Sequence, residues 1–177
     1  MKKLTFLSAI FLVASLSGYA QKITEGSLSF LKAGEELNVV FNYDALMIQG
    51  STEKEFLAEK GEEWAGQWEK AKAESYGKLF LEHMDKNLNA KKTLAVCGNY
   101  PHAPYQATVR VLTVGRGWGI ECQVVFTKTG DSAPLAKMSL IGNSRSTYGI
   151  GAPSYLTGTA FGYAGQNLGR FLTTKIK

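Results

Sequence analysis

The chain has 177 residues and a formal net charge of +5. Its lysines and arginines are spread along the chain, without the clustering among aromatic residues that nucleic-acid binding requires, so we expect no nucleic-acid partner. After the first twenty residues no segment approaches eighteen consecutive apolar residues, so we expect no integral membrane segment in the mature protein.

Those first twenty residues have the three parts of an export signal. Lys2 and Lys3 form a basic start, an apolar stretch follows, and Gly18 and Ala20 are the small residues that signal peptidase needs. Cleavage leaves Gln21 at the N-terminus, where a lipid-anchored protein has a cysteine. An uncleaved anchor helix or a buried core helix is the alternative interpretation.

The predicted organisation is a signal peptide at 1–20 and a single α+β domain at 21–177, located in the periplasm or outside the cell. The mature part has 157 residues, enough for one domain with its own core. Its formal charge is +3, because Lys2 and Lys3 leave with the signal.

The mature chain begins with two expected strands. We predict them at Ser27–Lys32 and at Leu37–Tyr43, separated by a turn at Gly34. In the second strand, apolar residues at every other position place one face against a core.

A helical region follows, rich in Ala, Glu and Lys and free of proline. Ser51 or Thr52 can cap its first turn. Gly61 is costly inside a helix, by about 1 kcal/mol relative to Ala, so we predict a short helix near 52–59 and a longer one near 62–88. The longer one carries two apolar sets a quarter-turn or more apart: Trp64, Trp68 and Ala71, then Tyr76, Phe80 and Met84.

The chain then returns to short strands. We predict four of them, at Thr93–Cys97, Ala107–Val114, Ile120–Lys128 and Leu135–Ile141. The expected fold class is α+β: a mostly antiparallel sheet, with the long helix and a C-terminal helix covering one face.

The C-terminal helix is predicted to pack unusually close to a neighbour. Four glycines lie on one of its edges: Gly158, Gly162, Gly165 and Gly169. Each costs about 0.5–1 kcal/mol relative to Ala, so we expect the sheet or the longer helix to approach this edge. A membrane dimer motif is the alternative, and Gln166, Asn167 and Arg170 argue against it.

The run from Gly115 to Gly119 is rich in glycine but joins two predicted strands. A dinucleotide-binding fingerprint needs a helix after its glycines, so we interpret the run as a strand connection with Trp118 as a lid or core plug. Loops held on a sheet are where recognition often occurs. The candidate binding residues are therefore Arg116 and Trp118, with Tyr100 and His102 from the loop before the strand at Ala107–Val114.

Cys97 and Cys122 can form a disulfide in an exported protein, but two separate buried thiols are the preferred interpretation. With His83 and His102 they lack the paired short spacings of a zinc site, and no thiol-protease signature surrounds Cys97. We predict no metal, no cofactor and no catalytic residue.

Most carboxylates lie in the helical region, where a lysine-rich helix usually turns them to water. A glycosidase nevertheless needs only two carboxylates across a cleft. A small secreted hydrolase that uses scattered carboxylates or His102 is therefore the rival interpretation.

Five segments are distinctive when taken together: Gly26–Lys32, Leu37–Asp44, Thr52–Phe56, Trp64 with Trp68, and Ala164–Leu172. With the glycine-rich connection, they resemble a group of small exported proteins of unknown function from Gram-negative bacteria. The order of elements is also similar to envelope lipoprotein domains related to the TolB N-terminal domain, which assemble on or near the outer membrane. This chain lacks their lipid-bearing cysteine, and the resemblance transfers no functional residue.

The function predicted from these observations is that of a non-enzymatic cell-envelope protein. It binds a partner protein or a glycan, and self-association is left open.

Overall fold

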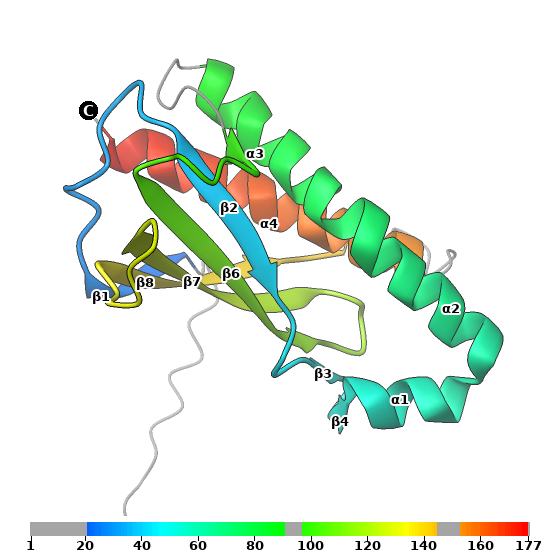
Figure 1. Ribbon diagram of the computed structural model, residues 1–177. Helices are drawn as coiled ribbons and strands as arrows, with labels where there is room; N and C mark the ends of the chain where they lie inside the picture. Colours follow the sequence, from blue (N-terminus) through cyan, green and yellow to red (C-terminus); the bar gives the residue numbers. More distant parts are fainter. Residues whose placement is uncertain (1–20, 91–96, 145–152, 177) are drawn as a thin grey trace, which may run out of the picture.

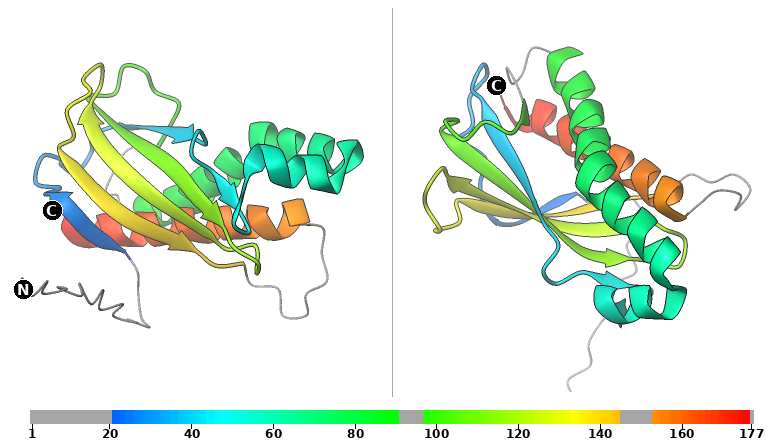
Figure 2. Two further views of the ribbon diagram at one scale, coloured as in Figure 1. Left: turned by 90° about the horizontal axis from the view of Figure 1, so that it is seen from below. Right: turned by 45° about the vertical axis from the view of Figure 1, so that its right-hand side comes forward.

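The computed structural model describes residues 21–90, 97–144 and 153–176. The predicted signal peptide lies outside these ranges, as does the strand expected at Thr93–Cys97 except for its last residue. The described chain has an α+β fold, in which helices cover one face of a sheet (Figures 1 and 2).

Within the described residues the sheet has eight strands. They are β1 (Lys22–Gly26), β2 (Leu37–Asn42), β3 (Met47–Ile48), β4 (Ser51–Thr52), β5 (Cys97–Gly98), β6 (Tyr105–Val114), β7 (Ile120–Lys128) and β8 (Ala136–Gly142). The main order is β1-β8-β7-β6-β2-β5, with β3 pairing to both β6 and β4. The strands predicted near β2, β6, β7 and β8 are confirmed within two residues at each end.

The predicted antiparallel character holds from β1 to β6, while β2 runs parallel to both β6 and β5. Leu37 lies opposite Tyr105 and Asn42 opposite Arg110. A parallel pair needs a long crossover between its strands. The helical region between β2 and β6 supplies that crossover, and the parallel pairing was not among the predictions made from the sequence.

The helices are α1 (Glu53–Lys60), α2 (Glu62–Ala71), the π-helical segment η1 (Lys72–Tyr76), α3 (Gly77–Ala90) and α4 (Pro153–Lys175). Thr52 caps α1 as expected: the Glu55 N–H donates to its hydroxyl at 3.3 Å, and the Thr52 N–H donates to the Glu55 carboxylate at 3.1 Å. Gly61, with a φ of 88°, separates α1 from α2. The predicted break between two helices is confirmed.

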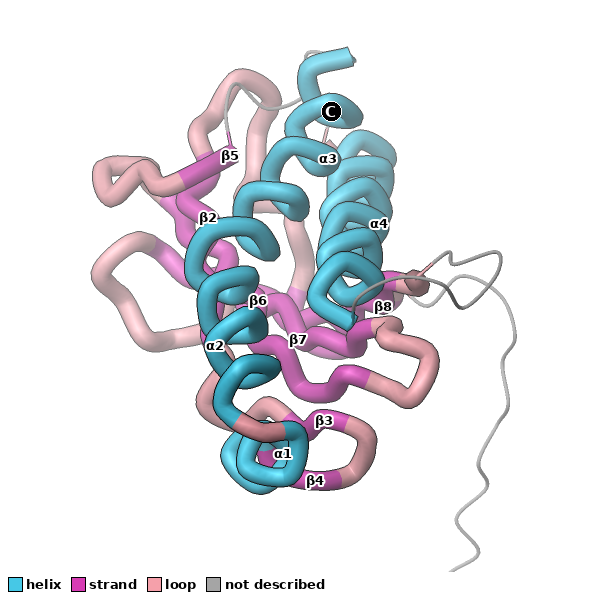
Figure 3. Tube along the Cα trace, turned by 90° about the vertical axis from the view of Figure 1, so that its right-hand side faces the viewer, coloured by secondary structure: helices cyan, strands magenta, loops and turns pink. Residues whose placement is uncertain are grey.

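Helices α2, η1 and α3 follow one another, and α4 lies beside them on the same face of the sheet (Figure 3). Beneath them, Ile120, Cys122, Val124 and Phe126 of β7 are buried, as their alternation predicted. Across the described ranges, none of the helices has the combination of length and apolar character that a bilayer crossing requires.

The glycine edge of α4 meets α3, which confirms the predicted close approach. A Cβ on Gly165 would overlap the main-chain carbonyl of Phe80, and one on Gly169 would lie 2.7 Å from the Met84 carbonyl oxygen. The opposite side of α4 is equally close to the sheet, because a Cβ on Gly142 of β8 would overlap the Ala160 carbonyl.

The strand predicted at Ser27–Lys32 is wrong. Those residues form turns, and the strand lies just before them as β1. Leu28 and Leu31 are both buried, and the Leu31 N–H donates to the Leu28 carbonyl at 3.1 Å. Their three-residue spacing therefore belongs to a turn rather than to an alternating strand.

Candidate functional site

Trp118 acts as the core plug that was one of its two predicted roles. It lies in the turn between β6 and β7 with a φ of 60°, and its ring is 6.2 Å from Trp64 and 6.4 Å from Phe56, centroid to centroid. Arg116 is exposed in the same turn. A shallow hollow of about 360 Å³ borders this turn, but neither residue lines it.

The other two predicted binding residues, Tyr100 and His102, precede the opposite end of β6. The Tyr100 N–H donates to the side-chain oxygen of Asn38 at 2.9 Å, while His102 is exposed. Ten residues of strand span roughly 33 Å. The structure therefore does not bring the four predicted residues together.

The two cysteines are also apart. Cys122 is a buried free thiol on β7, whereas Cys97 starts β5, and strands β6 and β2 lie between them. Neighbouring strands are about 4.8 Å apart, while a disulfide joins Cα atoms less than about 7 Å apart. This arrangement leaves the pair unbridged.

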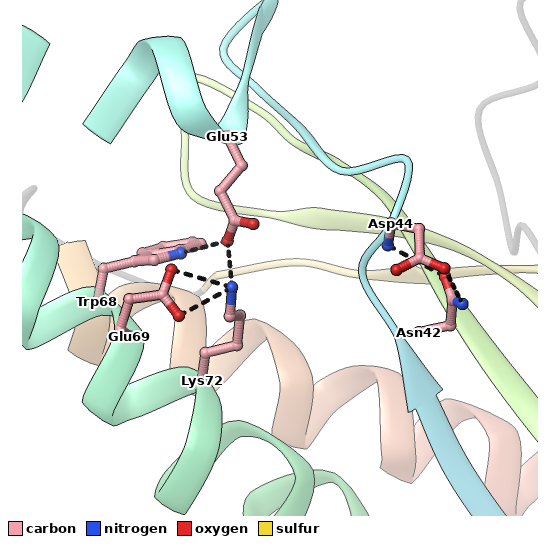
Figure 4. A network of polar contacts seen from close by, with 6 residues as sticks. All are labelled: Asn42, Asp44, Glu53, Trp68, Glu69 and Lys72. Atoms are coloured by element: carbon pink, nitrogen blue, oxygen red, sulfur yellow. Dashed lines mark hydrogen bonds and ion pairs between the residues drawn. The ribbon is translucent and has the colours of Figure 1, made fainter. Parts of the chain in front are cut away.

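A partly buried ion-pair network joins α1 to α2 and η1 (Figure 4). One Glu53 carboxylate oxygen accepts hydrogen bonds from the Trp68 indole at 2.7 Å and the Lys72 ammonium at 2.8 Å, and Glu69 is 3.0 Å from the same ammonium. Burial alone would lower the pKa of Lys72, but the hydrogen bonds to Glu53 and Glu69 raise it above its usual value. The network ties α1 to the helical segments that follow it, which is a structural role.

One hollow lined by described residues is a groove of about 450 Å³ between two walls of helix. One wall comes from α2, η1 and α3 and the other from the N-terminal half of α4. We call it the helix groove. Ten described residues line it: Ala71, Ser75, Leu79, His83, Ser154, Tyr155, Gly158, Thr159, Gly162 and Tyr163.

Two tyrosines of α4 line the groove, with glycines between them. Tyr155 is 67% exposed, the most exposed large apolar side chain among the described residues. Tyr163 lies eight residues further along α4, about 12 Å at 1.5 Å per residue. Gly158 and Gly162 contribute no side chain, and Cβ atoms there would lie 3.1 Å from Leu79 and 3.3 Å from His83.

Besides the two tyrosine hydroxyls, the polar side chains of the groove are three Ser or Thr hydroxyls and one imidazole. Ser75 comes from η1, Ser154 and Thr159 from α4, and His83 from α3. None of the ten described lining residues is Asp, Glu, Lys or Arg. The groove thus offers aromatic surface and neutral hydrogen-bonding groups.

The π-helical turn η1 explains how the continuous helix α2–η1–α3 directs side chains both into the core and into the groove. In a regular α-helix Trp68 and Tyr76 are eight positions apart, so they would differ by about 80°. The extra residue of a π turn reduces that difference to about 20°, and both side chains are buried. The angular offset between the two apolar sets of the long helix was therefore the sequence signal for η1. The same π turn places Ser75 at the groove.

No protein-family model matches the sequence, and no curated protein matches it. Similar solved structures include two PelC dodecamers from Paraburkholderia phytofirmans, one of them a variant. Their TM-scores are 0.39 and 0.40, their identities 15% and 14%, and the matches cover 89% of this chain and 98% and 97% of theirs.

A third similar structure is a Xanthomonas campestris protein described by the family model DUF330. Its TM-score is 0.40 at 11% identity, over 84% of this chain and 90% of that chain. Likenesses of this size assign the chain neither to a family nor to a function. The expected similarity to TolB N-terminal domains stays a prediction.

Proposed function

We propose that this chain is an exported, non-enzymatic protein of the bacterial cell envelope that binds a partner protein or a glycan in the helix groove. The observation that carries the proposal is the groove itself. It is a concave site with an exposed aromatic rim and a few converging polar groups, the usual form of a binding site.

The rival hydrolase would need catalytic groups gathered in a cleft. The described lining of the helix groove contains no carboxylate. The hollow beside the β6–β7 turn has one, Glu121, and a further hollow of about 300 Å³ between the end of β2 and the middle of β6 also has one, Asp44. His102 lines none of the three. A pair of carboxylates is the minimum for glycoside hydrolysis, so these hollows favour binding over hydrolysis.

The envelope location is proposed from the N-terminal segment. Its basic start, apolar stretch and small residues before Gln21 have the pattern of a cleavable signal. Mass spectrometry of protein from the native host should find an N-terminus at or within a few residues of Gln21. A retained Met1 would contradict export.

The binding role is tested by photo-crosslinking in the native host. Tyr155, at the rim of the groove, is replaced by p-benzoylphenylalanine, and Tyr100 is replaced in a matched control. Both tyrosines are exposed, but Tyr100 lies in the loop before β6. We expect an adduct of higher mass from position 155 only.

The nature of the adduct identifies the partner class. A protein band, a glycan-sensitive smear or a dimer of this chain would each support binding at the groove. An adduct from position 100 but not from 155 would move the site to the predicted loop, and no adduct from either would overturn the proposal.

A further inference from the structure

We propose that a second hollow, on the face of the sheet that the helices leave open, binds a small zwitterion of the α-amino-acid type. This hollow has a volume of about 300 Å³ and lies between the end of β2, the middle of β6 and β7. We call it the strand hollow. The helix groove lies among the helices that cover the other face, so the two sites are separate.

The strand hollow forms where β6 exchanges one neighbouring strand for another. Strand β2 pairs with β6 as far as Arg110, and β3 pairs with it from Thr113 onward. The two residues between them, Val111 and Leu112, have no ladder partner on this side. Leu112 has none on β7 either, because a bulge shifts the register there. Bulges are common beside active sites, where they redirect a side chain, and here Leu112 is 37% exposed at the hollow.

Polar side chains from three strands meet at the strand hollow. Asn42, Arg110 and Gln123 lie directly opposite one another on β2, β6 and β7, and all three line the hollow. Successive side chains of a strand point to opposite faces of the sheet. Because Val109 and Val124 beside them are buried in the core, these three side chains point away from the helices.

The carboxylate of Asp44 is held at the hollow by an Asx turn (Figure 4). The Asp44 N–H donates to the side-chain oxygen of Asn42 at 3.1 Å, and one Asp44 carboxylate oxygen accepts from the Asn42 amide at 2.7 Å. The other carboxylate oxygen accepts no hydrogen bond from the described residues. The turn therefore fixes the carboxylate and leaves one oxygen available to a ligand.

The strand hollow contains one cation and one anion that do not pair with each other. Among the described residues, the side chains of Arg110 and Gln123 have no hydrogen-bonding or ionic partner, and no ion pair joins Arg110 to Asp44. Elsewhere on the same face, Lys137 and Glu25 do pair, at 2.6 Å. Opposite charges that share a hollow without contact leave room for a ligand that bridges them.

The groups of the strand hollow match the two charges of an α-amino acid. A carboxylate can accept two parallel hydrogen bonds from the Arg110 guanidinium and another from the Gln123 amide. The free oxygen of Asp44 can accept from the ammonium group. A ligand with one charge of each sign leaves no charge in the hollow without a counter-charge, and Leu112 offers an apolar neighbour to its side chain.

Four probes test the two charges separately, by NMR titration of the mature chain, Gln21–Lys177, at neutral pH. L-Leucine carries both charges, 4-methylpentanoate lacks the ammonium group, and 3-methylbutylamine lacks the carboxylate. Glycerophosphoethanolamine carries both charges in the form of a lipid headgroup. We expect L-leucine to bind at least tenfold more tightly than either single-charge probe.

Two variants assign each charge of the ligand to its partner. In Arg110→Gln, L-leucine should bind no more tightly than 3-methylbutylamine, and in Asp44→Asn no more tightly than 4-methylpentanoate. Arg170→Gln is the matched control, because Arg170 is exposed on α4 and lines none of the three hollows. It should leave both affinity ratios unchanged. Thermal unfolding establishes that all three variants are folded.

The probes also separate the two sources of a zwitterion. Tighter binding of L-leucine assigns the strand hollow to free amino acids, and tighter binding of glycerophosphoethanolamine assigns it to a lipid headgroup, so either result supports a zwitterion site. Three results would overturn it: no saturable binding of either zwitterion, equal binding of L-leucine and its single-charge analogues, or unchanged affinity ratios in folded Arg110→Gln.

Discussion

The two halves of α4 carry the same glycine spacing but make different contacts with the neighbouring helix. In the C-terminal half, Gly165 and Gly169 face main-chain atoms of Phe80 and Met84. In the N-terminal half, Gly158 and Gly162 face the side chains of Leu79 and His83 and line the helix groove. In the C-terminal half, which we call the closed half, the backbones of α3 and α4 are in contact. In the N-terminal half, the open half, side chains of α3 hold the two backbones apart.

A glycine edge on a helix therefore predicts close approach of a neighbour without predicting whether main-chain or side-chain atoms make the contact. Main-chain atoms of a helix cannot move without shifting the whole helix, whereas a side chain can rotate. The first kind of contact locks two helices together, and the second leaves room beside it. Substitutions in each half of α4 test this difference separately.

The largest effect is expected from Gly165→Ala. The new methyl would overlap the Phe80 carbonyl, so α3 and α4 must separate. Overpacking of this kind costs roughly 1–3 kcal/mol, which should exceed the helix-propensity gain of up to about 1 kcal/mol. Urea unfolding of the purified variant should show a free energy of unfolding lower than that of the parent protein.

Gly66→Ala is the matched control. Gly66 lies inside α2, and a Cβ there meets nothing within 4 Å. Its replacement should stabilise the protein by about 0.5–1 kcal/mol through helix propensity alone. If Gly165→Ala stabilised the protein as much as Gly66→Ala does, the backbones of α3 and α4 would not be in contact at Gly165.

The buried layer beneath the helices should make stability fall in alkali. Burial, aided by Glu121, raises the pKa of the Cys122 thiol from 9.0 to about 12, and burial also raises the pKa values of Tyr43 and Tyr76 above 10.0. The unfolded chain releases these protons at lower pH than the folded chain does. Stability is therefore full below pH 9 and falls above it, by at most about 1.4 kcal/mol per pH unit and group.

Urea unfolding at pH 7, 8, 9 and 10 measures this decline, and Cys122→Ala should make it shallower between pH 9 and 10. A free energy of unfolding that stayed constant from pH 8 to pH 10 would show that Cys122 is not buried as described.

A smaller effect is expected from Gly162→Ala in the open half. The new methyl would lie 3.3 Å from the His83 ring, which can yield by a few tenths of an ångström. The helix-propensity gain of about 1 kcal/mol then offsets much of the crowding. Its free energy of unfolding should stay within about 1 kcal/mol of the parent protein, and a loss equal to that of Gly165→Ala would remove the difference between the two halves.

Much of the fold could be predicted because its signals are local. The Thr52 cap, the break at Gly61 and the alternation of β7 each depend on a few neighbouring residues, and each was found. The π turn was visible in the sequence only as an unexplained angular offset, around the helix axis, between the apolar set of Trp68 and that of Tyr76. The parallel pairing of β2 depends on the path of the crossover, which no local pattern encodes.

The candidate site could not be predicted for the same reason. The helix groove joins Ser75 and His83 to Tyr155 and Tyr163, residues far apart in sequence that meet only when α3 and α4 lie side by side. The residues predicted from the sequence were loop residues such as Arg116 and His102, and the fold places these at opposite ends of β6. Glycines of α4 were the available signal, since they set the distance between the groove's walls.

The most direct test of binding at the helix groove is to fill the groove with a large side chain. Thr159 and Thr173 both lie on α4, are half-buried, and donate their hydroxyl to a carbonyl three residues earlier at 2.7 Å, but only Thr159 lines the groove. Thr159→Trp should weaken binding to the isolated envelope of the native host at least tenfold. Thr173→Trp should leave it unchanged, and both variants should unfold within about 1 kcal/mol of the parent protein. Undiminished binding by a folded Thr159→Trp protein would contradict the account.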